Sequence, residues 1–449
     1  MNYKTPGVYV EEIAKFPPSV AQVETAIPAF IGYTAQGPKN EPTRISSMLE
    51  YETLFGAAKP ESFTFTVVAE TTTPPIKPRT VTATLETPNP FKMYYAMQMY
   101  FANGGGPCYI VSVGEYPSDK KVKLADLTAG LETLEKEDEP TLIVFPDAEG
   151  LTLENDAYEL YGLALDQAEL MKDRFVIMDV VGNTTNAVKN FRDNVTSGPS
   201  GERLKYGAAY HPKLETVLTY GYDSKVVMVS GQTLEYWKTK DSELYNLAKA
   251  AIEANKVVLA PSSAIAGVYA KVDSTSGVFK APANVGLNYV VAPTIKISHE
   301  DQESLNVDAT SGKSINAIRS FVGKGPVVWG ARTLDGNSNE WRYISVRRFF
   351  NMVEESVKKA TERFVFEPNT ANTWIRVQTM IENFLNQQWQ DGALAGSKPE
   401  EAYYVSVGLN KTMSAQDILE GRMIIEIGMA AVRPAEFIVL RFSHKLQEA

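Results

Sequence analysis

The chain has 449 residues, with 54 Asp and Glu against 44 Lys and Arg and a formal net charge of −10. This length predicts about two or three domains, and the acidic balance argues against nucleic acid as a general partner. The single cysteine, Cys108, excludes an internal disulfide and disfavours a cysteine-based metal cluster. Because no long apolar run occurs, neither a signal peptide nor membrane insertion is predicted, and folding in a reducing cytoplasm is expected.

Residues 1–26 combine a short β-prone patch with proline breaks on both sides. Val8, Tyr9 and Val10 favour an extended strand, while the flanking prolines interrupt local structure. Such a segment cannot bury enough surface to order itself. It is predicted to be either a frayed terminus or an arm that becomes ordered by adding a strand to another subunit's sheet.

The next part of the chain alternates strand and helix patterns. A buried strand is predicted at 27–33, a short helix at 46–55 with Ser47 as its cap, and surface excursions at 60–90 and 212–235. Between them, strands are predicted at 108–113, 141–145, 175–180, 207–210 and 257–260, and helices at 91–102, 154–171, 184–195 and 242–254. This order is typical of a mostly parallel sheet covered by helices.

An α/β enzyme would place its ligands at the C-terminal ends of such parallel strands. The polar residues predicted there are Asp147, Asp179, His211 and Ser262. Strand-end acids commonly cap the next helix, and the sequence holds neither the GxSxG turn of hydrolases nor a complete phosphate loop around Lys313. No catalytic, cofactor-binding or metal-binding residue is therefore predicted, and a hydrolase that acts through His211 is kept as an alternative.

The C-terminal third begins with a strand at 327–329 and a turn, and then changes to a helical period. Apolar residues from Val346 to Phe364 recur at steps of three and four, which predicts an amphipathic helix, and a second such helix ends at 391–392. The elements predicted after it are strands at 402–409 and 423–429 and a short helix at 414–420 that is capped by Ser414. A last strand, at 436–442, is predicted either to be an edge strand of its own domain or to pair away from it.

Several short motifs of this sequence resemble the conserved C-terminal domain of contractile tail sheath proteins. In family order they are VWGARTL (328–334), WRYISVRR (341–348), VFEPN (365–369), GALAG (392–396) and RPAEFIVLRF (433–442). The opening TPGVYVEEI, the element FANGGGPCYIVSV and the segment at 262–287 resemble the same family. That segment is predicted to be a small-residue stretch for close packing, followed by a polar loop at 273–277.

The resemblance implies a structural subunit, not an enzyme, that polymerises as stacked hexameric rings around an inner tube. Contraction of the sheath would drive the tube through a target envelope, although a static sheath is an alternative. The implied partners are further copies of the chain, the inner tube protein, baseplate and terminal cap proteins, and a second sheath paralogue as an open question. Neither a cofactor nor nucleic acid is implied. Assembly would take place in the bacterial cytoplasm, within a virion or phage-tail-like particle that is released or anchored at the cell envelope.

The same resemblance implies an α/β outer body and an α+β inner domain that is completed by strands exchanged between subunits. The expected divisions are an N-terminal arm at 1–26, an outer body at 27–330, an inner domain at 331–432 and a C-terminal arm at 433–449. The residues predicted to pair with neighbouring subunits are Val8, Tyr9, Val10, Phe437, Ile438, Val439 and Leu440. Polar residues between the inner-domain strands, including Lys411 and Arg422, are predicted to contact the tube.

Overall fold

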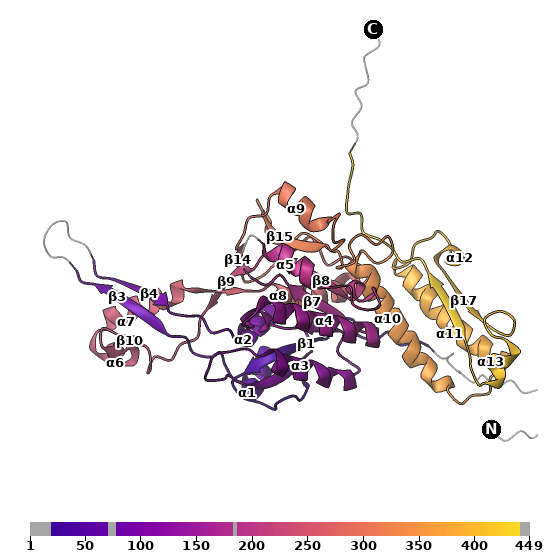
Figure 1. The fold of residues 1–449 in the computed structure, drawn as a ribbon, viewed down its shortest axis with the longest axis horizontal. Coiled ribbons are helices and arrows are strands. Elements are labelled where there is room, and N and C mark those ends of the chain that lie inside the picture. Colours follow the sequence, from indigo (N-terminus) through magenta and orange to yellow (C-terminus); the bar gives the residue numbers. More distant parts are fainter. Residues whose placement is uncertain (1–18, 71–77, 183–185, 441–449) are drawn as a thin grey trace, which may run out of the picture. The chain divides into compact units, whose positions relative to one another are not determined.

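The fold is known from a computed structural model, which describes residues 19–70, 78–182 and 186–440 (Figure 1). The chain forms two compact units. Among the residues described, they consist of Glu24–Met352 with residues 433–440, and of Val353–Val432 with residues 19–23. The smaller unit therefore begins inside helix α10 (Ile344–Thr361), whereas the predicted start of the inner domain is residue 331. One amphipathic period runs through the whole helix, so the sequence pattern carries no mark of this division.

A nine-stranded sheet forms the centre of the larger unit, in the order β13-β16-β15-β8-β7-β6-β1-β5-β2. Its parallel middle strands are β15 (Ile315–Phe321), β8 (Gly207–His211), β7 (Phe175–Asp179), β6 (Leu142–Val144), β1 (Pro28–Thr34) and β5 (Cys108–Glu115). Antiparallel strands flank them: β2 (Thr43–Ile45) on one side, β16 (Gly325–Val328) and β13 (Val285–Gly286) on the other. The prediction of a mostly parallel sheet is thus confirmed.

Alternate residues of β1 enter two separate cores. Ala29, Ile31 and Tyr33 belong to one core, and Phe30 belongs to the other. The first core includes helices α3 (Leu124–Thr133), α4 (Glu154–Met171) and α5 (Ala187–Asn194), and the second includes α2 (Met93–Ala102) and α8 (Ser262–Ser276). All seven residues of β1 are buried, as expected for a strand that is covered on both faces.

Helix α8 corrects one prediction. A polar loop was predicted at 273–277, but the helix continues to Ser276 and ends at Gly277 with a positive φ of 89°. The polar residue fits inside the helix because its carboxylate binds the buried guanidinium of Arg348. Such long-range partners cannot be seen in a local pattern.

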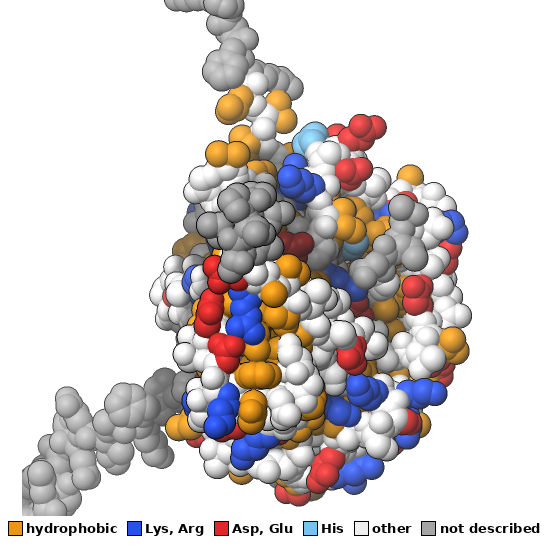
Figure 2. All heavy atoms as spheres, turned by 90° about the vertical axis from the view of Figure 1, so that its left-hand side faces the viewer, with side chains coloured by type: hydrophobic (Ala, Val, Ile, Leu, Met, Phe, Trp, Pro, Cys, Tyr) orange, Lys and Arg blue, Asp and Glu red, His pale blue; other side chains and the backbone are white. Residues whose placement is uncertain are grey.

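The two predicted excursions come together at the end of the larger unit drawn at the left of Figure 1. Hairpin β3 (Phe63–Val68) and β4 (Thr80–Leu85) packs with β10 (Met228–Val229) and with α7 (Ser242–Ala254), next to α6 (Leu234–Lys240). Figure 2 faces this end and shows apolar side chains in the middle of the face, between charged ones.

A second sheet lies beside this hairpin end, and it corrects another prediction. Strand β12 (Lys256–Leu259) was expected in the parallel sheet, but it pairs antiparallel with β9 (Leu214–Thr219). The other edge of β9 pairs with β14 (Val290–Pro293). An apolar strand pattern defines a strand but does not define its partner.

The smaller unit is built on two antiparallel strands, β17 (Tyr403–Val407) and β18 (Ile425–Met429). The long helix α11 (Ala371–Gln390) packs against β17. The short helix α13 (Ala415–Leu419) begins with a capping box formed by Ser414 and Asp417, so the predicted cap at Ser414 is confirmed. Within the described ranges, no helix is long and apolar enough to cross a membrane.

Candidate functional site

The C-terminal segment that was predicted to pair with other subunits has no strand within the single chain. Residues 433–440 form no regular secondary structure, and four consecutive apolar side chains are 71% to 79% exposed. They are Phe437, Ile438, Val439 and Leu440. Burying one such side chain stabilises a fold or a complex by roughly 1.5–3 kcal/mol, so this segment is a strong candidate for an interaction.

Glu436, which precedes Phe437, is bound to the larger unit by several hydrogen bonds. The guanidinium of Arg332 donates to both carboxylate oxygens of Glu436, from Nε to Oε1 at 2.9 Å and from Nη2 to Oε2 at 2.7 Å. Two further donors reach the same carboxylate: Asn306 Nδ2 at 2.7 Å and Tyr343 Oη at 3.1 Å. Burial alone would raise the pKa of Glu436, but the hydrogen bonds from Arg332 and Asn306 hold it below its usual value.

Arg332 is fixed in place by its own surroundings. Its backbone N–H donates to Asn316 Oδ1 and its carbonyl accepts from Asn316 Nδ2, both at 2.8 Å. A Cβ atom at Gly330 would come within 2.7 Å of Asn316 Oδ1, so glycine is needed for this close approach. The guanidinium also donates to the carbonyl of Gly336 at 3.1 Å. The arginine side chain is only 4% exposed, and Glu436 supplies its negative partner.

The N-terminal end of the larger unit is held by a second buried arginine. Arg348 Nη2 donates to the carbonyl of Thr25 at 2.9 Å and to Asp273 Oδ2 at 2.5 Å, while the Thr25 hydroxyl donates to the same oxygen at 2.6 Å. The side chains of Arg348 and Asp273 are 3% and 6% exposed. The guanidinium lies 4.5 Å from the ring centre of Tyr269. The predicted pairing residues Val8, Tyr9 and Val10 lie outside the described residues.

The smaller unit offers strand edges to which another chain could pair. Each of β17 and β18 has one partner in its two-stranded sheet, so the opposite edge of each has no ladder partner among the residues described. Val405 and Val407 of β17 are buried, while Tyr404 is 54% exposed on the other face, where its hydroxyl donates to Glu426 at 2.7 Å. An open edge with one apolar face suits the addition of a strand.

The two residues predicted to contact the tube are both exposed in the smaller unit. Arg422 already has partners within its own chain, because its guanidinium lies 2.8 Å from Asp417 Oδ1 and 2.6 Å from Glu420 Oε2. Lys411 lies in the turn after β17, where its backbone N–H donates to Gly408. The positive charge offered by this region therefore comes from Lys411 more than from Arg422.

The strand-end acids serve as helix caps, as expected, but not for the helices that follow them in sequence. Asp147 accepts from the backbone N–H groups of Lys92, at the start of α2, and of Tyr33. Asp179 accepts from the backbone N–H of Ser262, at the start of α8. Burial raises the pKa of Asp147 to about 6 and that of Asp179 to about 7. Both carboxylates thus have structural partners that account for their burial.

His211 ends β8, and burial lowers its pKa to about 4. In the ranges that the structure describes, no serine or carboxylate is hydrogen-bonded to its ring, and no group of histidine, cysteine or carboxylate side chains could hold a metal ion. Lys313 is buried and donates to the carbonyl of Arg192 instead of projecting from a phosphate loop. The geometry therefore gives no specific support to the hydrolase alternative.

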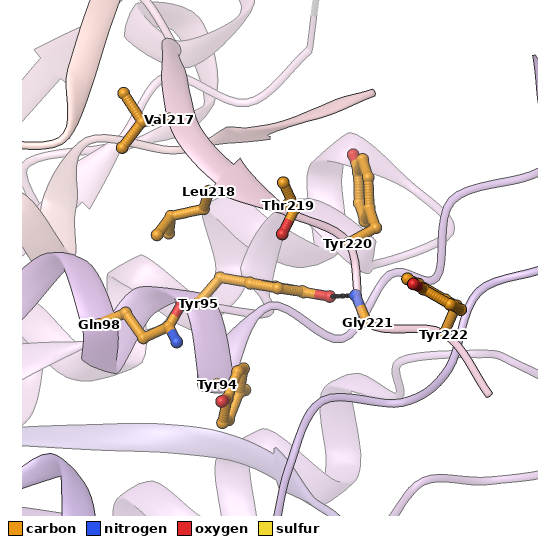
Figure 3. A pocket seen from close by; sticks show the side chains of 9 residues that line it. All are labelled: Tyr94, Tyr95, Gln98, Val217, Leu218, Thr219, Tyr220, Gly221 and Tyr222. Carbon is orange, nitrogen blue, oxygen red and sulfur yellow. Dashed lines mark hydrogen bonds between the residues drawn. The ribbon is translucent and has the colours of Figure 1, made fainter. Parts of the chain in front are cut away.

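A hollow of about 470 Å³ lies beside α2 and β9, and tyrosines dominate its lining (Figure 3). The hydroxyl of Tyr95 accepts from the backbone N–H of Gly221 at 2.9 Å, so its phenol is tied to the wall. The remaining lining residues are Tyr94, Gln98, Val217, Leu218, Thr219, Tyr220 and Tyr222. This lining carries no carboxylate, amine or imidazole, and so offers no acid–base pair.

Two features were missed by sequence reasoning: the pair of Arg332 with Glu436 and the pair of Arg348 with Asp273. The partners are separated by 104 and 75 residues, beyond the reach of any local pattern. A signal was nevertheless present for Arg332, which is the only charged residue of VWGARTL, whereas Arg348 is one of three arginines in WRYISVRR. A single charge in such an apolar motif needs a buried partner.

Comparison with known proteins places these observations in a family context. Residues 337–445 match the family described as phage tail sheath C-terminal domain. The chain is similar to the tail sheath protein of Enterobacteria phage T4, with 27% identity over 27% of this chain and 18% of that protein. It is similar to the tail sheath protein of Vibrio phage KVP40, with 24% identity over 40% of this chain and 25% of that protein. The matches thus span a quarter or less of these curated relatives.

Solved structures match along the whole chain. The helical sheath of the anti-feeding prophage in its contracted state is 35% identical over 99% of this chain and 100% of that chain, with a TM-score of 0.66. A chain of the six-fold symmetrised baseplate of the same particle is 34% identical over 99% and 100%, with a TM-score of 0.67. The PVC sheath complex of an extracellular contractile injection system, also contracted, is 30% identical over 99% of both chains, with a TM-score of 0.68.

Proposed function

This chain belongs to the contractile tail sheath family, and we propose that it is a structural subunit of a sheath that polymerises around an inner tube and contracts to drive the tube through a target envelope. The observation that carries the proposal is the match, at 35% identity, to all of a contracted sheath chain. The exposed apolar segment Phe437–Leu440 supports it independently, because four such side chains in a row are otherwise costly to leave in water.

We propose that subunits stack as hexameric rings and that their terminal arms pair with strands of neighbouring copies. The supporting geometry has two halves. Among the residues that the structure describes, the main-chain groups of Phe437–Leu440 have no ladder partner, and neither have the outer edges of β17 and β18, which can receive a strand. Residues Val8, Tyr9 and Val10 are proposed to pair in the same way, on the strength of their β-prone sequence. Main-chain ladders of this kind hold subunits together without fixing the orientation of their bodies.

Contraction then needs no nucleotide. The sheath is proposed to assemble in an extended state that is kinetically trapped, and to relax by rotation and sliding of whole subunits into a wider, shorter state. Arm ladders would survive this rearrangement while contacts between the bodies are exchanged. The mechanical work would come from the additional surface that the bodies bury against one another.

The proposed partners are further copies of the chain, the inner tube protein, and baseplate and terminal cap proteins, with a second sheath paralogue as an open question. The turn and helix at 411–422 are proposed to face the tube, with Lys411 as the main positive group. Charge reversal at Lys411 and Arg422 should weaken co-assembly with the tube protein. If co-assembly is unchanged, another surface makes this contact. Assembly is proposed in the bacterial cytoplasm, in a particle that is later released or anchored at the envelope.

Sedimentation of the assembled chain tests the role of the exposed segment. The double variant Ile438→Asp with Leu440→Asp places two charges on one face of the proposed strand, and we expect it to remain in the supernatant as a folded monomer while the wild type pellets as polymer. The matched control, Leu49→Asp with Val322→Asp, changes two side chains that are 73% and 106% exposed, and it should pellet like the wild type. Pelleting of the first variant at wild-type levels would contradict a role of this face in assembly.

A further inference from the structure

The C-terminal arm becomes free of the larger unit, which is called the body below, after Glu436. Val432 still donates its backbone N–H to the carbonyl of Ala393 within the smaller unit, and Glu436 is bound by Arg332 within the larger unit. After Glu436, the next four side chains are all more than 70% exposed. Within the part of the chain that the structure describes, Glu436 is therefore the last anchored residue.

The residues around the Glu436 carboxylate stabilise its bound state. The Arg332 side chain is 4% exposed, so release of Glu436 would leave a buried guanidinium without its anion. The carboxylate also receives hydrogen bonds from Asn306 and Tyr343, which come from two further segments of the larger unit. Four donor groups from three residues thus converge on one side chain of the arm, in a fork geometry that a neutral side chain cannot reproduce.

We propose that Arg332 and Glu436 form a clamp that sets the length of the flexible tether between the sheath body and the strand that the C-terminal arm gives to a neighbouring copy. With the clamp closed, the tether begins at Phe437. With the clamp open, the tether begins after Val432, the last residue of the smaller unit, and gains residues 433–436, which add roughly 13 Å of extended chain. This inference rests on the proposed sheath function, since only an arm that pairs with another copy makes the tether length matter.

The tether length affects how neighbouring subunits are coupled. A strand on a short tether stays near the sheet edge that accepts it, which raises its effective concentration there. A short tether also transmits the displacement of one subunit body to the next almost completely. An added 13 Å, roughly, would let one body move before its neighbour is pulled. Arg332 and Glu436 are therefore positioning residues: they would act through the arm, not by touching the neighbour.

A spin label reports directly on the clamp in the unassembled full-length chain. Cys108 is fully buried, so a cysteine introduced at the exposed Ala435 can be labelled selectively. In the otherwise wild-type chain, we expect the label at position 435 to move slowly, with the arm held at Glu436. In the Glu436→Gln variant, we expect the population with a fast-moving label to rise roughly tenfold, since the charged half of the fork is lost.

Two controls make the result specific. Glu139→Gln removes a carboxylate from the exposed pair with Arg44, at the same change of charge, and should leave the label at position 435 slow. A label at Leu440→Cys, beyond the clamp, should move fast in all variants. Circular dichroism shows whether each variant is folded, and Arg332→Lys gives a second test, because lysine keeps the charge but loses the two-pronged contact.

The outcomes separate the clamp from the sheath function. Release of the label at 435 in Glu436→Gln and Arg332→Lys but not in Glu139→Gln supports the clamp. Equal mobility in the wild type and Glu436→Gln, or equal release in Glu139→Gln, overturns it. Electron microscopy of the same proteins tests the proposed function separately. A clamp that opens as expected in a chain that never forms cylinders would retain the anchor but remove its role as a tether in a sheath.

Discussion

The two ends of the larger unit are both held by buried arginines, but by different groups of the chain. At the N-terminal end, Arg348 binds the backbone carbonyl of Thr25, and its negative partner Asp273 belongs to helix α8. At the C-terminal end, Arg332 binds the side chain of Glu436, which belongs to the arm itself. The first ion pair is complete without the terminal segment. The second exists only while the arm is docked.

This difference shows which end is coupled to the stability of the body. Detaching Thr25 would cost hydrogen bonds but would leave Arg348 paired with Asp273. Detaching Glu436 would leave the charge of Arg332 buried and unpaired, apart from its bond to the carbonyl of Gly336. The C-terminal arm is thus tied to the folding of the body by a charge, and the N-terminal end by neutral acceptors. Three substitutions and one pH series can test this contrast.

The largest effect is expected for Asp273→Ala. It leaves Arg348 almost fully buried without an anion, so we expect the free energy of unfolding to fall by roughly 3–5 kcal/mol. Denaturant unfolding followed by circular dichroism measures this change. The exposed pair of Lys249 and Glu253 is the reference, and Glu253→Ala should cost less than about 1 kcal/mol. Equal costs for the two variants would contradict the importance given to the buried pair.

A smaller loss of unfolding free energy is expected for Glu436→Gln. The amide keeps the shape of the side chain and one acceptor oxygen, but the charge-assisted bonds to Arg332 are weakened, so we expect to lose roughly 1–3 kcal/mol. The same denaturant measurement applies. A change within about 0.3 kcal/mol would mean that the arm docks without contributing to the stability of the body.

Thr25→Val should have a smaller effect still. The substitution removes the hydroxyl that donates to Asp273, while the carbonyl continues to accept from Arg348 and Thr141. We expect a loss of about 1 kcal/mol. If this loss equals or exceeds that of Glu436→Gln, the contrast between a neutral and a charged anchor is wrong.

The pH dependence provides the finest test. The folded state holds the pKa of Glu436 below its usual value of 4.5, so the carboxylate contributes stability above that pH and loses the contribution as pH falls through the lowered pKa. The difference in unfolding free energy between the wild type and Glu436→Gln should therefore be constant near neutral pH and shrink in acid. A difference that grows in acid would mean that the pKa shift has the opposite sign.

Sequence periodicity predicted where the helices and strands lie better than it predicted which elements pair or pack with one another. The helix predicted at 154–171 is found as α4 (Glu154–Met171), and the predicted caps at Ser47 and Ser414 are confirmed, because these signals lie within one turn of the helix. The acids Asp147 and Asp179 were correctly expected to cap helices, but the helices they cap are α2 and α8. Parallel strands bring distant helix starts to one edge of the sheet, and no local pattern encodes that neighbour.

The ion pairs at the two ends of the larger unit could likewise not be predicted from local sequence patterns. Arg332 stands out as the only charge in VWGARTL and Arg348 does not stand out, and the partners of the two arginines lie 104 and 75 residues away. The predicted strand at 436–442 shows a related limit: residues 436–440 carry a β-prone pattern but have no strand in a single chain. Under the proposed function, the acceptor for this pattern lies in another copy.

The most direct test of the account is electron microscopy of the negatively stained full-length chain beside versions that lack residues 1–22 or residues 437–449. The second deletion keeps Glu436 and its contact with Arg332, so the body should remain folded, as circular dichroism can confirm. The account predicts long striated cylinders from the full chain and none from either deletion. A monodisperse monomer from the full chain, even with the tube protein added, would contradict assembly through the arms, and cylinders from both deletions would contradict the arms' part in it.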